Sequence, residues 1–301
     1  MSDSSVIASN LDVTGNSAVT GNSTVVGRLP VSAFVIAFNE EEHIVGCIQS
    51  LSFCDEVIVI DSFSTDRTVE LAREAGARVV QQKWTGYRAQ KEYGLSLVTH
   101  DWVINLDADE RISAELRQGI LRVLEEKAAK TVTNFDDECI GYYINRVVYY
   151  LGRWWRSGGW YPEYRLRFFR RDAVRWGGVD PHEKPLTDGR TERLAGEIEH
   201  YTYKDMHDQF RRLDNFSSIA AREEFGRGKR SGLVKITFNP LLRFAKFYLF
   251  KRGYREGFPG LLVALNEAVY TYMKYAKLWD EEFRSCRSAG TAGREVGNQE
   301  R

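Results

Sequence analysis

The sequence lacks the features that would place it in several large classes of protein. Its four cysteines show no metal-ligand spacing such as C-x-x-C, so they are expected to be reduced thiols rather than zinc ligands or a disulfide framework. The N-terminus has neither a basic region nor an apolar stretch, which disfavours a signal peptide. No uncharged apolar run approaches the roughly 20 residues that a transmembrane helix needs. We therefore expect a cytoplasmic protein.

An excess of charge of one sign is also lacking, because 42 Lys and Arg balance 42 Asp and Glu. That balance disfavours a polyanionic partner, and no nucleic acid is expected. A hydrophobic content of 43% in 301 residues is typical of a globular protein with a sizeable core. The first 28 residues are instead rich in Ser, Thr, Asn and Gly, and we expect disordered tails over 1–28 and 281–301.

Short apolar runs alternate with segments of helical character over the first half of the chain. This alternation predicts an α/β fold with a mostly parallel sheet that helices cover on both faces. Ligands bind at the carboxyl ends of the strands in such sheets, and Asn39, Asp61 and Asp107 fall at those ends. The expected strands are 31–37, 56–60, 78–80 and 102–106, and the expected helices are 41–51, 67–75, 87–97 and 113–127.

A pair of acidic residues, Asp107 and Asp109, directly follows the last of these strands. Two carboxylates one residue apart at a strand end can converge on one hard cation, and oxygen ligands suit Mg²⁺ or Mn²⁺. Such an ion would neutralise a diphosphate and stabilise it as a leaving group. An Asp-x-Asp pair is also common in solvated turns, so its weight comes from the motifs around it.

Further motifs surround this pair in a characteristic order. They are 36–44 (IAFNEEEHI), 57–68 (VIVIDSFSTDRT), 89–91 (AQK) and 101–110 (DWVINLDADE). Together they resemble the family 2 glycosyltransferases over roughly residues 31–200, most closely the bacterial subgroup that includes the lipopolysaccharide-core β-glucosyltransferases. The resemblance implies a GT-A type nucleotide-sugar-binding domain over 29–200, followed by a helical region over 201–280.

The same resemblance implies a reaction and a set of site residues. The reaction is inverting transfer of a hexose, with glucose the expected sugar, from a UDP-sugar to a saccharide acceptor. A lipid-linked acceptor in cell-surface polysaccharide or lipopolysaccharide core biosynthesis would fit the subgroup. The metal would be held by Asp109 and Asp107, and His200 would complete the metal or diphosphate site. The nucleotide-sugar would lie against Asn39, Glu41, Asp61, Lys91 and Asp107.

The catalytic base is expected in residues 176–183 (WGGVDPHE), which follow the strand-like segment 167–170. Members of the subgroup carry a Val-His-Glu-like stretch after an Arg-Leu-Phe-Arg-like strand, and these segments are similar to both. Inversion needs no covalent intermediate, so one base near the anomeric carbon suffices. Glu183 is the expected base, and Asp180 and His182 are the alternatives.

Three other interpretations stay open from the sequence. Transfer to a polyprenyl phosphate would need no general base, because that acceptor oxygen is already anionic. A haloacid-dehalogenase-like phosphatase also places Asp-x-Asp after a strand, but Arg111 stands where such enzymes carry Thr or Ser. An inactive binding protein on the same fold is the third, and the intact Asp107, Asp109 and Glu183 disfavour it.

The aromatic residues between 154 and 164 also have two interpretations. Their rings either stack on sugar faces or pack in a core or an interface, and packing is the commoner use of such a cluster. The residues are Trp154, Trp155, Trp160, Tyr161 and Tyr164.

Basic residues are concentrated in segment 227–255, which holds nine Lys or Arg and no acidic residue. A helix over 239–251, with Asn239 as its cap and Pro240 at its first position, would combine apolar and basic side chains. A core helix explains the apolar residues alone, whereas an anionic membrane surface also explains the basic flanks. We expect peripheral contact with the inner face of the cell membrane, without a spanning segment.

Overall fold

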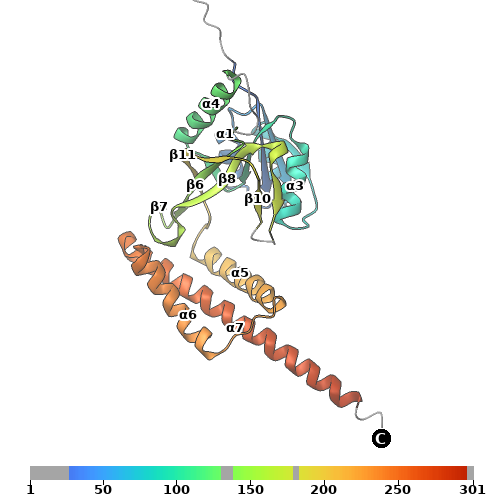
Figure 1. The fold of residues 1–301 in the computed structure, drawn as a ribbon, viewed down its shortest axis with the longest axis vertical. Helices are drawn as coiled ribbons and strands as arrows, with labels where there is room; N and C mark the ends of the chain where they lie inside the picture. The colour runs from blue at the N-terminus through green and yellow to red at the C-terminus, as the bar shows by residue number, and fades with distance from the viewer. Residues whose placement is uncertain (1–26, 130–137, 179–182, 297–301) are drawn as a thin grey trace, which may run out of the picture.

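The computed structural model describes residues 27–129, 138–178 and 183–296 (Figure 1). A sheet with helices on both sides forms the upper part of the molecule in this view, and the long helices of the C-terminal region lie below it. The disordered tail expected over 1–28 lies outside the described residues, apart from Gly27 and Arg28.

Four parallel strands form the half of the sheet that carries the motifs. Each expected strand is present, and three of the four end one residue later than expected. Their order across the sheet is β3-β2-β1-β4, so β1 lies between β2 and β4. The strands are β1 (Val31–Ala37), β2 (Glu56–Asp61), β3 (Arg78–Gln81) and β4 (Trp102–Asp107).

Helices cover both faces of this half-sheet, which is why every residue of β1 is buried. Val35 and its alternate neighbours pack with α1, α2 and α4, whereas Phe34 and Ile36 pack on the other face with α3. The side-chain period of two in a strand thus sends apolar residues into two separate cores. The helices are α1 (Ile44–Ser50), α2 (Thr68–Glu74), α3 (Tyr87–Leu97) and α4 (Ala114–Ala129).

The second half of the sheet brings distant residues to the end of β4. Strand β8 pairs antiparallel with both β4 and β6, β11 runs parallel to β6, and β5 pairs antiparallel with β11. A hairpin of β9 (Arg175–Gly177) and β10 (Lys184–Leu186) lies apart from this sheet. The other strands are β5 (Glu110–Ile112), β6 (Gly141–Tyr150), β7 (Arg153–Trp155), β8 (Glu163–Arg170) and β11 (Thr191–His200).

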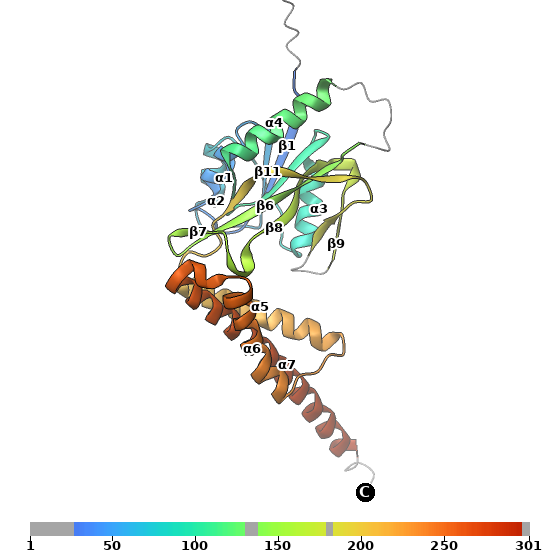
Figure 2. The ribbon, with the colours of Figure 1, turned by 60° about the vertical axis from the view of Figure 1, so that its left-hand side comes forward.

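The C-terminal region is helical, so the predicted α/β fold with a mostly parallel sheet and following helices is confirmed. Asp205 caps the first helix, because its side chain accepts a hydrogen bond from the amide of Asp208. Helix α7 packs against both α5 and α6 (Figure 2). The elements are α5 (Met206–Gly226), α6 (Leu233–Ala245), the π-helical turn η4 (Lys246–Phe250), the 3₁₀ turn η5 (Gly253–Glu256) and α7 (Gly257–Val296).

The helix expected over 239–251 is wrong in its start and in its end. Helix α6 begins at Leu233, so Pro240 lies inside the helix instead of at its first position. A proline removes one backbone hydrogen bond, and the extensive packing of α6 on α7 offsets that loss. The chain then changes to a π-helical turn at Lys246.

The tail expected over 281–301 is also not disordered as far as the structure describes it. Helix α7 continues to Val296, and residues 297–301 lie outside the described part. Residues 281–289 contain no Gly or Pro that would end a helix. The rings of Trp279 and Phe283, one turn apart, stack at a centroid distance of 5.3 Å.

An aromatic seam joins the sheet to the C-terminal helices. Tyr150 and Trp155 are buried in one cluster with Phe247 of η4 and with Val263 of α7. Trp160 packs against this cluster and donates a hydrogen bond to Glu267 at 3.1 Å. Packing is therefore the role of Trp155 and Trp160.

Within the described residues, no helix is long and apolar enough to cross a membrane.

Candidate active site

A cavity of about 1230 Å³ lies at the carboxyl ends of β1 and β4. The expected site residues Lys91, Asp107, Asp109, Glu183 and His200 all line it. Strands β8 and β11 supply further lining, and α5 closes the side toward the helical region. The fold thus gathers residues from four distant segments around one cavity, which lies at the strand ends where ligands bind in such sheets.

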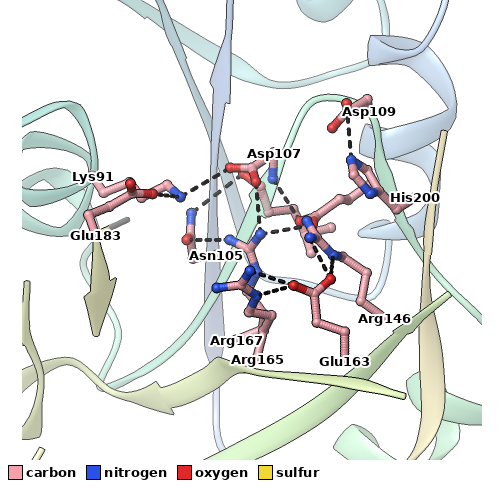
Figure 3. Close-up of polar contacts among 12 residues, drawn as sticks. Lys91, Asn105, Asp107, Asp109, Arg146, Glu163, Arg165, Arg167, Glu183 and His200 are labelled. Carbon is pink, nitrogen blue, oxygen red and sulfur yellow. Dashed lines mark hydrogen bonds and ion pairs between the residues drawn. The ribbon is translucent and has the colours of Figure 1, made fainter. Parts of the chain in front are cut away.

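Asp107 is held by two cations at the end of β4 (Figure 3). Its Oδ2 accepts a hydrogen bond from Arg167 at 2.8 Å, and its Oδ1 lies 3.4 Å from Lys91 Nζ. Burial opposes ionisation of this carboxyl, but the charges of Arg167 and Lys91 outweigh it and hold its pKa well below the usual range. Asp107 is therefore a fixed anion whose charge is already balanced.

Arg167 belongs to a buried ionic network that the motifs did not indicate. It also donates to Glu110 at 2.8 Å and to Asn105 at 2.8 Å. Glu110 is fully buried and accepts a hydrogen bond from a second cation, Arg146, at 3.1 Å. Glu110 further accepts the backbone amide of Asp107 at 3.0 Å. These contacts fix the turn that carries both aspartates. The sequence feature that could have indicated the network is Glu110, which directly follows Asp-Ala-Asp.

Asp109 and His200 both line this cavity and lie next to each other (Figure 3). Its Oδ2 lies 3.3 Å from His200 Nε2, and its carbonyl accepts the amide of Tyr201 at 2.9 Å. The pairing of β11 with β5, which sets His200 opposite Glu110, produces this approach. Burial opposes ionisation of Asp109, but the charge and hydrogen bond of His200 lower its pKa.

Glu183 lies on the other side of Asp107, beside Lys91 (Figure 3). Lys91 Nζ donates to Glu183 Oε1 at 2.8 Å and stands 5.3 Å from the centroid of the Trp176 ring. Glu183 Oε2 is buried and has no hydrogen-bond partner in the described part of the chain. The alternative bases Asp180 and His182 lie outside the described residues.

The family profile "Glycosyl transferase family 2" matches residues 32–179. A lipopolysaccharide core biosynthesis glycosyltransferase of Rhizobium meliloti, LpsC, is 30% identical over 86% of this chain and 96% of its own length. The chain belongs to glycosyltransferase family 2. Its α/β domain is therefore the GT-A type domain that the resemblance implied, and the phosphatase interpretation is wrong.

Other similar proteins include an uncharacterized glycosyltransferase of Rickettsia typhi, RT0209. It is 27% identical over 85% of this chain and 88% of that protein. Among solved structures, glucosyl-3-phosphoglycerate synthase from Mycobacterium tuberculosis, in complex with Mn²⁺, UDP and glucosyl-3-phosphoglycerate, shares 34% identity. That match covers 28% of this chain and 35% of that chain, with a TM-score of 0.26.

Two residues expected against the nucleotide-sugar do not line the cavity of this glycosyltransferase. Asp61 is fully buried, and its carboxylate accepts the amide of Ser64 at 3.0 Å and the side chain of Gln81 at 3.1 Å. Asn39 Oδ1 accepts the amide of Thr65 at 2.8 Å. Both side chains therefore shape the loop after β2. That loop presents the exposed Phe63, with a φ of 61°, to the cavity.

Glu41 also does not line the cavity, whereas Glu40 does. The exposed Glu41 accepts the amide of Arg67 at 3.1 Å, next to the start of α2. Burial raises the pKa of Glu40 to about 7, and the negative charge of Asp109 adds to the effect. Only the run of three glutamates marked this residue in the sequence, and the run does not say which of them faces the cavity.

Proposed function

We propose that this glycosyltransferase moves a hexose, with glucose the expected sugar, from a UDP-sugar to a saccharide acceptor with inversion. The observation that carries the proposal is the unpaired, buried Oε2 of Glu183 in the same cavity as Asp107 and Asp109. A buried carboxylate oxygen without a partner is costly unless a ligand uses it. An acceptor hydroxyl is such a ligand.

Glu183 is the general base in this proposal. Its Oε2 takes the proton of the acceptor hydroxyl while the oxygen of that hydroxyl attacks the anomeric carbon of the donor. The bond from the anomeric carbon to the UDP oxygen breaks on the opposite face, so the configuration inverts and UDP leaves with the bonding electron pair. Lys91 holds Oε1 of the same carboxylate, which leaves Oε2 as the free proton acceptor.

A divalent cation, Mg²⁺ or Mn²⁺, belongs to the same proposal. Within the described residues, no three His, Cys, Asp or Glu side chains are already grouped to hold a metal ion. Asp109 and His200 fit one as a pair, because an anionic oxygen and an imidazole nitrogen face each other in the cavity. Asp107 is the third expected ligand and is already paired with Arg167. When bound there, such an ion would supply positive charge for the departing diphosphate.

The donor is proposed to lie between the ends of β1 and β4. Asp107 and Lys91 would contact it directly, since both line the cavity. Asn39, Glu41 and Asp61 would act through the conformation of the loops that they hold together. The similarity to LpsC supports an acceptor of the lipopolysaccharide core, and the cytoplasmic location at the membrane's inner face remains part of the proposal.

UDP release tests the proposal. The purified chain is incubated with a panel of UDP-sugars and Mn²⁺, with and without a saccharide or glycolipid acceptor, and the anomeric configuration of the product is determined by NMR. Acceptor-dependent release from one UDP-hexose with inverted product is the expected result. Transfer to a polyprenyl phosphate that persists in Glu183→Gln would instead support the alternative acceptor. No turnover with any donor would support the inactive binding protein.

A further inference from the structure

In the described part of the chain, no element covers a row of large apolar side chains on α6 and η4. We call this surface the α6 face. Seven large apolar side chains on it are between 55 and 80% exposed. Isolated exposed apolar residues are ordinary, but a continuous set of this kind marks an interaction surface. The α6 face consists of Leu233, Val234, Phe238, Leu241, Leu242, Leu249 and Phe250.

The spacing of these residues shows that most of them share one side of the helix. Val234, Phe238 and Leu241 follow one another at intervals of four and three residues, which is the spacing of neighbours on a helical surface. Leu242 lies four residues after Phe238 and extends the same side, and Leu249 and Phe250 follow within η4. The opposite side carries Phe244 and Phe247, which pack in the aromatic seam.

Cations border the α6 face, and acidic residues are absent from its segment. Residues 227–255 hold nine Lys or Arg and no Asp or Glu. Arg243 is engaged by Glu267 and lines the cavity, so it does not belong to this surface. In the described ranges, no ion pair joins a carboxylate to Lys235, Lys246, Lys251, Arg252 or Arg255.

We propose that the α6 face docks on the surface of an anionic lipid bilayer. An apolar helical side inserts into the boundary between headgroups and acyl chains, while neighbouring Lys and Arg contact anionic headgroups. A symmetric dimer through this face is disfavoured, because it would bring Lys235 and Lys246 toward the same cations of a second copy, and these like charges would repel. A nucleic acid would match the cations but would leave the aliphatic residues in water. The bilayer is the partner that matches both.

Docking through this face would place the catalytic cavity close to the membrane. Arg243 of α6 and Glu267 of α7 line that cavity, so the docking helix also forms part of its wall. An acceptor held in the membrane would then reach the site without leaving the surface. The inference goes beyond the transfer reaction and does not depend on it, because binding to vesicles is measured without a donor or an acceptor.

The experiment is co-sedimentation of the full chain with lipid vesicles. The vesicles contain phosphatidylcholine alone, or phosphatidylcholine with roughly 30% phosphatidylglycerol as the anionic fraction. Each composition is tested at low salt and in about 1 M salt, where charges are screened beyond about 3 Å. Binding to the anionic vesicles at low salt, and its loss in high salt, is expected. The double variant Lys235→Gln/Lys246→Gln should lower the partition coefficient about 25-fold, at about fivefold for each cation. The charge-conserving Lys235→Arg/Lys246→Arg should bind like the wild type.

Apolar variants test the other half of the surface. Phe238→Ser/Leu241→Ser should weaken binding to anionic vesicles at least tenfold. Phe210→Ser/Trp279→Ser is the matched control, since these rings on α5 and α7 are 46 and 47% exposed outside the α6 face. Circular dichroism verifies that each variant is folded. Equal binding by all variants, or no preference for anionic lipid, would overturn the proposal. So would a dimer in vesicle-free solution that Phe238→Ser/Leu241→Ser makes monomeric.

Discussion

Lys91 Nζ lies 2.8 Å from Glu183 Oε1, and the other oxygen of that carboxylate, Oε2, is buried without a partner in the described residues. Lys91 also approaches Asp107 Oδ1 at 3.4 Å, so one ammonium group stands between the proposed base and the carboxylate at the end of β4. The ion pair orients Glu183 and leaves Oε2 as the oxygen that we propose takes the proton of the acceptor.

Replacing Glu183 by Gln should separate donor binding from turnover. The amide keeps the size of the side chain and can still accept a hydrogen bond from Lys91, but it cannot take a proton. We expect nearly unchanged affinity for the nucleotide-sugar and a kcat lower by about 10²–10⁴-fold, the usual contribution of a general base. Calorimetric titration and UDP release measure the two quantities. If Asp180→Asn shows that loss and Glu183→Gln does not, the base is Asp180.

Removal of the proposed metal site should abolish transfer without unfolding the chain. Asp109→Asn removes an anionic oxygen that faces His200, and we expect no measurable UDP release together with weaker Mn²⁺ binding in calorimetry. EDTA should inactivate the wild type, and Mg²⁺ or Mn²⁺ should restore it. The control is Asp172→Asn, a carboxylate paired with Arg170 outside the cavity. Full activity of metal-free wild type would exclude the metal.

Arg167 should be important for stability as well as for the site. It bridges the buried Asp107 and Glu110, so Arg167→Met leaves two carboxylates without their shared cation. Breaking a buried ion pair by removing one partner costs about 3–5 kcal/mol of unfolding free energy. Arg165→Met is the control, because that exposed ion pair with Glu163 should contribute about 1 kcal/mol or less. Urea unfolding measures both, and equal losses would show that the network is not needed.

The strands and the family were predictable from the sequence because their signals are local. Each buried strand is a short apolar run followed by a polar residue, and both sheet faces are covered, so the run is unbroken. The acidic pair at residues 107 and 109 lies where such a run ends. Asp107 and Asp109 line the cavity, together with Lys91, Glu183 and His200, which the family resemblance had indicated.

What the sequence did not indicate depends on contacts between distant segments or on backbone angles. The bridge from Arg167 to Glu110 joins β8 to β5, and no local pattern pairs those residues. Asn39 has a φ of 54°, so the alternation of side chains along β1 does not continue past it. The sequence pattern therefore could not predict that Glu40 lines the cavity and Glu41 does not. The local pattern favours Pro240 at a helix start because its missing amide is harmless there, whereas packing on α7 lets the helix run through it.

Glu40 should make the protein less stable as the pH rises. Its pKa is raised to about 7 in the folded chain, from a usual value of 4.5, chiefly by burial. Between these two values the unfolded chain releases the proton while the folded chain keeps it, so stability falls with rising pH and the loss is complete above pH 7. The shift corresponds to a loss of at most about 3 kcal/mol.

The substitution Glu40→Gln removes that titration. In metal-free protein, the variant should match the wild type near pH 4.5 and should gain up to about 3 kcal/mol of unfolding free energy between pH 5 and pH 8. Glu74→Gln on α2 is the control, because Glu74 is exposed and lies outside the cavity, and it should give no pH-dependent difference. Urea unfolding at pH 5, 6, 7 and 8 follows the difference. A constant offset between Glu40→Gln and the wild type across this range would show that Glu40 ionises in the folded protein as it does in the unfolded chain.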